Sequence, residues 1–196
     1  MRRSAQSAST ARFAVLLSGP LMGQVQEIST RDYSVLSDFL RAQLDGENFF
    51  RTGPKGSVIA PFTDANLKHL AIREGDWMKS RLGLASDTLA DFEQCADRKM
   101  AITKRFDLPV EYQIALPEAT SDIKDMDDKE IRALYAHYPG TNGVIQFSCI
   151  GVNASQTQAL FFVERNGHAP NGRWILMQKN ASGKWILKSE LIKWMV

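Results

Sequence analysis

The chain has 196 residues, of which 44% are hydrophobic and 23% are charged. This composition is typical of one globular domain with a core of its own. The 24 basic and 22 acidic side chains leave a net charge of +2, too small to indicate nucleic acid or an acidic lipid surface as a partner. After the first residues, no apolar run approaches the roughly 18 to 20 residues of a membrane span.

Residues 1–25 have the outline of a secretory signal peptide, because three arginines precede the apolar run Phe13–Leu17. The run is short, however, and Leu21 stands where a cleavage site ending at Gly23 would need a small residue. A disordered tail or an unused upstream start codon fits equally well. Export to the periplasm and a cytoplasmic location both stay open, and residues 26–196 are expected to form a single α+β domain.

Helices are expected in the first two thirds of the chain, where apolar residues recur at helical spacing after capping residues. The predicted segments are 29–44, with Ser29 and Thr30 as cap candidates, 86–100, and 122–138, which stops at Pro139 and Gly140. The segment 63–83 is ambiguous, with a turn or two of helix around Asn66 to Ile72. Short strands are expected at 56–62 and 110–116.

After Gly143 the apolar period changes to two, and turn residues separate four segments that begin near Gly143, Thr157, Gly172 and Gly183. These segments predict a four-stranded antiparallel meander. Helices followed by a sheet indicate an α+β fold in which N-terminal helices pack on one face of a curved, mainly antiparallel C-terminal sheet.

Both faces of the strand around 159–164 are apolar, since Ala159, Phe161 and Val163 alternate with Leu160 and Phe162. Something must therefore cover each face, whether a helix layer, a pocket or a partner. In the last strand the alternation slips after Ser189, which predicts a β-bulge near Lys188 to Glu190.

The meander also carries a recognisable pattern of residues. They are Gly143, Ser148, Ile150, Gly151, Val152 and Asn153, then Thr157–Val163, then Gly183, Lys184, Trp185 and Trp194. With them the chain resembles an uncharacterised family of small, mostly exported bacterial proteins whose strands read roughly "G-x-x-x-x-S-x-V-G-F-N", "T-Q-A-L-V-Y-V" and "G-K-W". The resemblance covers about half of the chain and implies a fold outline, but no reaction.

Many members of that family carry a Cys-Gly pair in the hairpin after the second strand, where this chain reads "NGHAPNGRW". A disulfide-clamped hairpin is therefore not implied here. The two cysteines, Cys95 and Cys149, have no family role. They fit either one disulfide in an oxidising compartment or two buried thiols in a reducing one.

The sequence contains no catalytic, nucleotide or metal motif, and it predicts no cofactor. His69, His137 and His168 lack the i, i+4 spacing of a helical metal pair. His168 stands in a turn near Glu164 and Arg173, and could serve as an acid or base with Glu164 and Tyr112. The simpler interpretation is a solvated turn histidine.

The aromatic side chains of the meander form the second candidate site. Trp174, Trp185 and Trp194, with Arg173 and neighbouring lysines, would suit a binding surface. A sheet edge protected by lysines produces the same pattern, and we favour that interpretation.

We therefore expect a binding or interaction domain of the bacterial cell envelope, with a protein or a hydrophobic small molecule as its partner. The alternative is an enzyme or ligand carrier with a cone-shaped apolar pocket like that of nuclear transport factor 2-like folds. A pocket with a paired acid and base would favour the enzyme, and a filled core with an exposed aromatic patch would favour the binder.

Overall fold

The computed structural model describes residues 25–45, 57–65, 67–116, 128–141, 143–167 and 170–195. Within them the elements follow the order α1 (Thr30–Asp45), β1 (Ser57–Ile59), α2 (Lys68–Leu82), α3 (Ser86–Cys95), β2 (Tyr112–Ile114), α4 (Asp128–His137), β3 (Gly143–Phe147), β4 (Gly151–Val152), β5 (Gln158–Gly167), β6 (Asn171–Lys179) and β7 (Trp185–Met195). Residues 1–24, where the signal-peptide interpretation falls, lie outside the described part.

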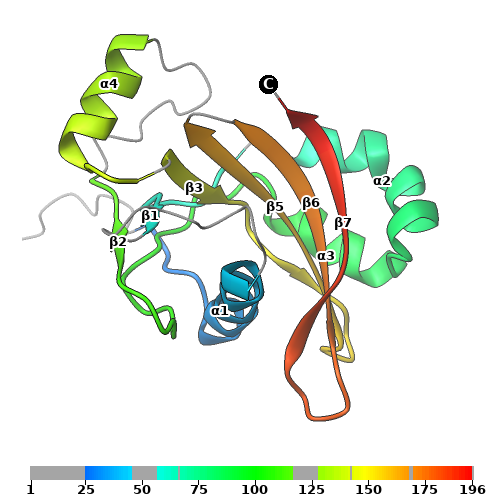
Figure 1. Cartoon of the computed structure of the whole chain (residues 1–196). Helices are drawn as coiled ribbons and strands as arrows, with labels where there is room; N and C mark the ends of the chain where they lie inside the picture. Colours follow the sequence, from blue (N-terminus) through cyan, green and yellow to red (C-terminus); the bar gives the residue numbers. More distant parts are fainter. Residues whose placement is uncertain are drawn as a thin grey trace, which may run out of the picture.

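The seven described strands form one mixed, open and curved sheet (Figure 1). Their order is β2-β1-β3-β5-β6-β7, with the short β4 paired to β5. The neighbours β3, β5, β6 and β7 are antiparallel, which confirms the predicted meander. β1 pairs in parallel with both β2 and β3, so the early strands extend the same sheet. One shared sheet makes the described chain a single α+β domain.

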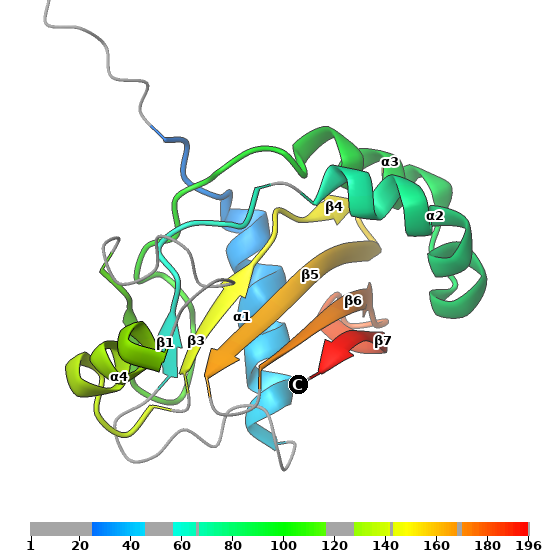
Figure 2. The ribbon, with the colours of Figure 1, turned by 90° about the horizontal axis from the view of Figure 1, so that it is seen from above.

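Helices cover both faces of the sheet (Figure 2), whereas the sequence analysis placed them on one. α1 packs on the face that carries Phe161 and Val163, in a core with Phe39 and Leu40. α2 and α3 pack on the opposite face, which carries Leu160 and Phe162. α4 covers β1 and the start of β3. The helices divide in this way because β5 is apolar on both sides, and each side needs a layer to exclude water.

α1 begins where its cap residues predict. The Ser29 hydroxyl accepts a hydrogen bond from the Asp32 N–H at 3.2 Å, and the Asp32 carboxylate accepts one from the Ser29 N–H at 3.1 Å. This reciprocal pair is a capping box that uses aspartate in place of glutamate.

α2 is longer than the predicted turn or two. The prediction was too short because the buried face of this helix includes Glu74 and Gly75. A charged residue and a glycine at buried positions interrupt the repeat of apolar residues from which an amphipathic helix is predicted.

The predicted bulge in the last strand is confirmed. Met177 pairs with Leu187 while Leu176 pairs with Ser189, so Lys188 is the extra residue. At a second register shift Arg173 pairs with Ile192 and Gly172 pairs with Trp194, so Lys193 is also an extra residue. Bulged lysines on an edge strand discourage pairing with another chain, in line with the favoured interpretation of the lysine pattern.

Candidate functional site

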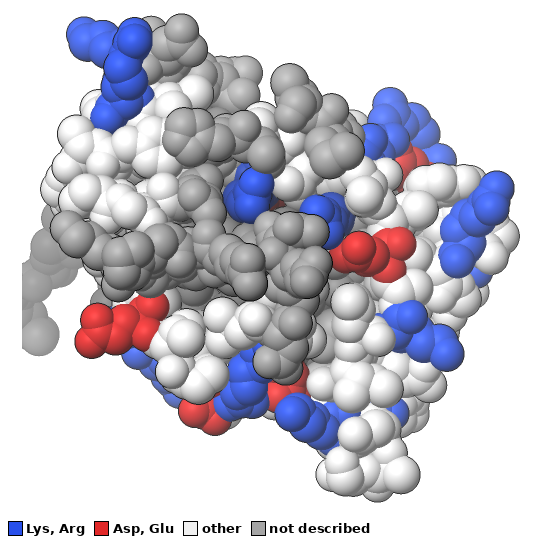
Figure 3. All heavy atoms as spheres, viewed as in Figure 1, with Lys and Arg blue, Asp and Glu red and all other residues white. Residues whose placement is uncertain are grey.

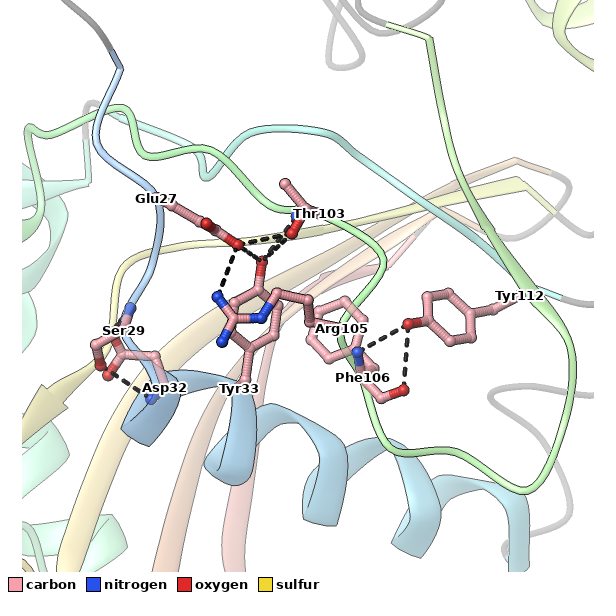
Figure 4. A network of polar contacts seen from close by, with 8 residues as sticks. All are labelled: Glu27, Ser29, Asp32, Tyr33, Thr103, Arg105, Phe106 and Tyr112. Atoms are coloured by element: carbon pink, nitrogen blue, oxygen red, sulfur yellow. Dashed lines mark hydrogen bonds and ion pairs between the residues drawn. The ribbon is translucent and has the colours of Figure 1, made fainter.

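A polar network joins the start of α1 to the segment before β2 (Figure 4). We call Glu27, Tyr33, Thr103 and Arg105 the amino-terminal seam. The Tyr33 hydroxyl donates to Glu27 Oε1 at 2.9 Å and accepts from the Thr103 N–H at 2.8 Å. The Thr103 hydroxyl also donates to Glu27 Oε1, at 2.6 Å, and the Arg105 guanidinium lies over the Tyr33 ring.

The titration behaviour of the amino-terminal seam favours a structural role. Hydrogen bonds from Thr103 and then Tyr33 lower the pKa of Glu27 below its ordinary value of 4.5. Burial raises the pKa of Tyr33 above its ordinary value of 10.0. Near neutral pH the carboxylate therefore stays ionised and the phenol stays protonated, so neither group is poised to exchange a proton. The hydrogen bonds of the amino-terminal seam hold the segment at Glu27 against the loop at Thr103.

Tyr112, a predicted catalytic candidate, is fully engaged by backbone. Its buried hydroxyl accepts a hydrogen bond from the Phe106 N–H at 2.8 Å and donates to the Phe106 carbonyl at 3.2 Å. Burial raises the pKa of Tyr112. These contacts close the loop that leads into β2.

The structure does not bring Tyr112 and Glu164 together. Tyr112 belongs to the core beneath α1, whereas Glu164 follows Phe162 on the opposite face of β5. Glu164 is buried, opposite Gly172 in β6 and Gln146 in β3. His168, the third member of that group, lies outside the described residues.

Two of the three tryptophans predicted as a binding surface are core residues. Trp174 is fully buried under α2 and donates its indole N–H to Glu74 at 3.1 Å. Lys193 also bonds to the Glu74 carboxylate, so this group ties α2 to β6 and β7. Trp185 lies on the opposite face, buried in the core beneath α1. The side chain of Trp194 lies outside the described residues.

The face of the sheet beneath α1 is packed with side chains from that helix. The Phe39 ring meets the rings of Phe147 and Phe161 edge-on, with centroids 6.3 and 5.1 Å away. Val35, Leu36 and Leu40 fill the same core.

A group of polar residues lies at the end of β5, and we call Arg165, Asn171, Arg173 and Glu190 the arginine end. The sequence indicated Arg173 as a candidate binding residue, but the other three were missed. Arg173 donates through Nε to Asn171 Oδ1 at 3.1 Å and through Nη1 to Glu190 at 3.3 Å. Arg165 pairs with Asn171 across the strands. The signal was present in the sequence, because alternation after Phe161 and Val163 places Arg165 on a core-facing position.

Gly151, Asn153 and Gln158 lie where α3 meets β4 and β5, and together with Thr88 and Phe92 we call them the α3 junction. A Cβ on Gly151 would lie 2.5 Å from the backbone N of Phe92 and from the Thr88 carbonyl oxygen, so glycine is required for α3 to approach this closely. The Asn153 carboxamide oxygen accepts the N–H groups of Thr157 and Gln158 and closes the turn.

Gln158 caps α3 from the sheet. Its Oε1 accepts the Ala85 N–H at 2.7 Å and the Thr88 hydroxyl at 2.9 Å, and its amide donates to the Gly83 carbonyl. Ala85, at the N-cap position, has no side chain that could do this. These three hydrogen bonds join the start of α3 to the sheet.

A disulfide cross-links the two sides of the α3 junction. Cys95 at the end of α3 is bonded to Cys149 between β3 and β4, with Cα atoms 6.0 Å apart, within the usual range for disulfides. Cys149 is fully buried. The sequence left the pairing of these cysteines open, and the structure joins them.

Two features are absent from the described residues. They contain no cluster of three or more histidine, cysteine or acidic side chains placed to hold a metal ion. Within the same residues, no helix has the length and apolar character needed to cross a bilayer.

Comparison with known proteins returned no matching family model, no matching curated protein and no matching solved structure.

Proposed function

We propose that this chain is a binding or interaction domain of the bacterial cell envelope rather than an enzyme. The observation that carries the proposal is the disulfide between Cys95 and Cys149. Disulfides persist in oxidising compartments such as the periplasm and are rare in a reducing cytosol. A domain of this length does not need a staple to fold, so the cross-link is best explained by the compartment in which the protein works.

Two sequence features support the same compartment. The arginines before Phe13–Leu17 give residues 1–25 the outline of a secretory signal. The strand pattern resembles a mostly exported bacterial family.

Exposed apolar side chains on α2 and on both faces of β7 support binding. Trp77 of α2, which packs beside β7, keeps 42% of its surface exposed, and Ile186 and Ile192 of β7 keep 45% and 49%. Basic and acidic side chains are interspersed on the face seen in Figure 3. Apolar side chains among mixed charges are typical of transient interaction surfaces.

The test is osmotic-shock fractionation of the native host, followed by native mass spectrometry of the released protein. Release with the envelope fraction, together with a mass that includes a retained ligand or partner, is the expected result. A variant that lacks residues 1–25 is the matched control and should remain in the cytosol with its cysteines reduced. A wild-type protein found in the cytosol as a ligand-free monomer would overturn the proposal.

A further inference from the structure

The two cysteines of the disulfide lie in different surroundings. Cys95 is the last residue of α3 and is partly exposed, and Gln94 and residues 97–99 beside it are exposed. Cys149 is fully buried between β3 and β4, in the core that α3 covers (Figure 2). A molecule in solution can therefore approach the chain at Cys95, whereas Cys149 is out of its reach.

α3 closes the approach to Cys149. The Sγ atom of Cys149 lies 3.8 Å from the carbonyl oxygen of Phe92 in α3. A Cβ on Gly151 would lie 2.5 Å from the Phe92 backbone N, so no second molecule fits between α3 and β4. Phe162 and Trp174 fill the same core. Reaction at Cys149 from outside therefore requires α3 to move away from the sheet.

The buried cysteine is nevertheless well placed to react with Cys95. Their Cα atoms are 6.0 Å apart, a separation at which a disulfide forms without movement of the backbone. Other contacts hold α3 in this position, such as the hydrogen bond at 2.7 Å from the Val152 N–H to the Asp91 carboxylate. Once Cys95 is joined to another sulfur, Cys149 can attack it from inside the protein with the advantage of an intramolecular reaction.

We propose that Cys95 is the site at which a thiol–disulfide exchange partner, a protein with a reactive disulfide, oxidises this chain. The Cys95 thiolate attacks one sulfur of the partner's disulfide, which forms a mixed disulfide and releases the other partner sulfur as a thiolate. The Cys149 thiolate then attacks the Cys95 sulfur, the bond between the two cysteines forms, and the second partner sulfur leaves. Two electrons pass to the partner, and its two thiolates take up, through water, the protons that the cysteines lose.

This inference rests on the proposed envelope function, for which it names a partner and the residue that the partner contacts. The same route in reverse applies to reduction. An attacking thiolate reaches the disulfide at Cys95 and releases Cys149 as the leaving thiolate.

The first experiment compares Cys149→Ala with Cys95→Ala in the purified full-length protein, with oxidised glutathione as the probe. The variants are matched, because each lacks the same disulfide and keeps one thiol. Folded Cys149→Ala should gain a glutathione adduct about tenfold faster or more, since Cys149 is reached only when α3 opens. Intact mass measures both rates, which should become similar in urea. Equal rates in the folded proteins would overturn the proposal.

The reduced wild-type chain tests the same order without a substitution. It is treated under native conditions with less than one equivalent of a maleimide, and peptide mapping locates the label. Label at Cys95 should exceed label at Cys149 by about tenfold or more, because buried structural cysteines are inert. Equal labelling of the two cysteines would contradict entry at Cys95.

The partner is tested in the native host with the same two variants. Cys149→Ala should accumulate a mixed disulfide with a second protein, because the sulfur that releases the partner is missing. The adduct is measured as an added mass that reductant removes, and Cys95→Ala should carry about a tenth as much or less. Equal adducts in both variants, or none in Cys149→Ala, would overturn the proposal.

Those results leave the proposed envelope function standing, because fractionation of the host tests it separately. Preferential reaction at Cys95 in the purified protein, together with a wild-type chain found in the cytosol, would have the opposite meaning.

Discussion

β5 begins at the α3 junction and ends at the arginine end, and these two regions use their polar groups differently. At the junction each described polar group meets a fixed partner, as when Gln158 bonds to Ala85, Thr88 and Gly83. At the other end Arg165 and Arg173 are diagonal neighbours in the strand register, and Arg173 donates hydrogen bonds to Asn171 and Glu190. The comparison teaches that Gly151 and Gln158, at one end of β5, serve close packing and helix capping, whereas charged side chains gather at its other end.

The disulfide is the largest single contribution that we expect at the α3 junction. Replacing both cysteines with alanine should lower the free energy of unfolding by about 4 kcal/mol, because the bond closes a loop with a sequence separation of 54 residues. Urea unfolding with and without reductant measures the effect. An unchanged midpoint after complete reduction would show that the junction does not depend on the bond.

Gly151→Ala tests how closely α3 packs. The added methyl group meets backbone atoms of Thr88 and Phe92 at 2.5 Å, and overpacking of this kind costs about 2–3 kcal/mol. Gly75→Ala is the matched control. There the methyl group meets only the end of the Leu89 side chain, at 2.8 Å, and a helix-propensity gain of about 1 kcal/mol offsets the contact. Similar urea midpoints for the two variants would contradict tight packing at Gly151.

Glu27→Gln should have the smallest effect and serves as a reference outside both regions. The pKa of Glu27 is lower in the folded chain than its ordinary value of 4.5. The ionised Glu27 carboxylate therefore contributes to the free energy of unfolding above pH 4.5, and this contribution is lost as the pH falls through the pKa of the folded state. The variant should show a shallower loss of stability in acid than the wild type, and little change near neutral pH. If wild type and variant lost unfolding free energy equally steeply in acid, Glu27 would not stabilise the fold through the amino-terminal seam.

Local patterns in the sequence predicted much of the fold. The cap at Ser29, the four strands of the meander and the bulge at Lys188 each depend on residues close together in the chain. The extent of α2 was missed because Glu74 is buried through contacts with Trp174 and Lys193, about a hundred positions away. The disulfide was left open for the same reason, since nothing near Cys95 indicates Cys149.

The candidate site was harder to predict than the fold. Trp174 and Trp185 were considered together as aromatic residues, but strand alternation and the two helix layers bury them on opposite faces. Arg165 was overlooked because a single charged residue at the end of an apolar strand usually marks where the strand leaves the core. Only the register of β5 on β6 brings it beside Arg173.

The most direct test of the central claim is the thiol state of Cys95 and Cys149 in the native host. Cells are quenched in acid, the protein is unfolded and treated with a maleimide without reductant, and its intact mass is measured. We expect no maleimide adduct, and two adducts once the protein has been reduced. Two adducts without reduction would show that the cysteines are free where the protein works, and would contradict a binding domain of an oxidising envelope compartment.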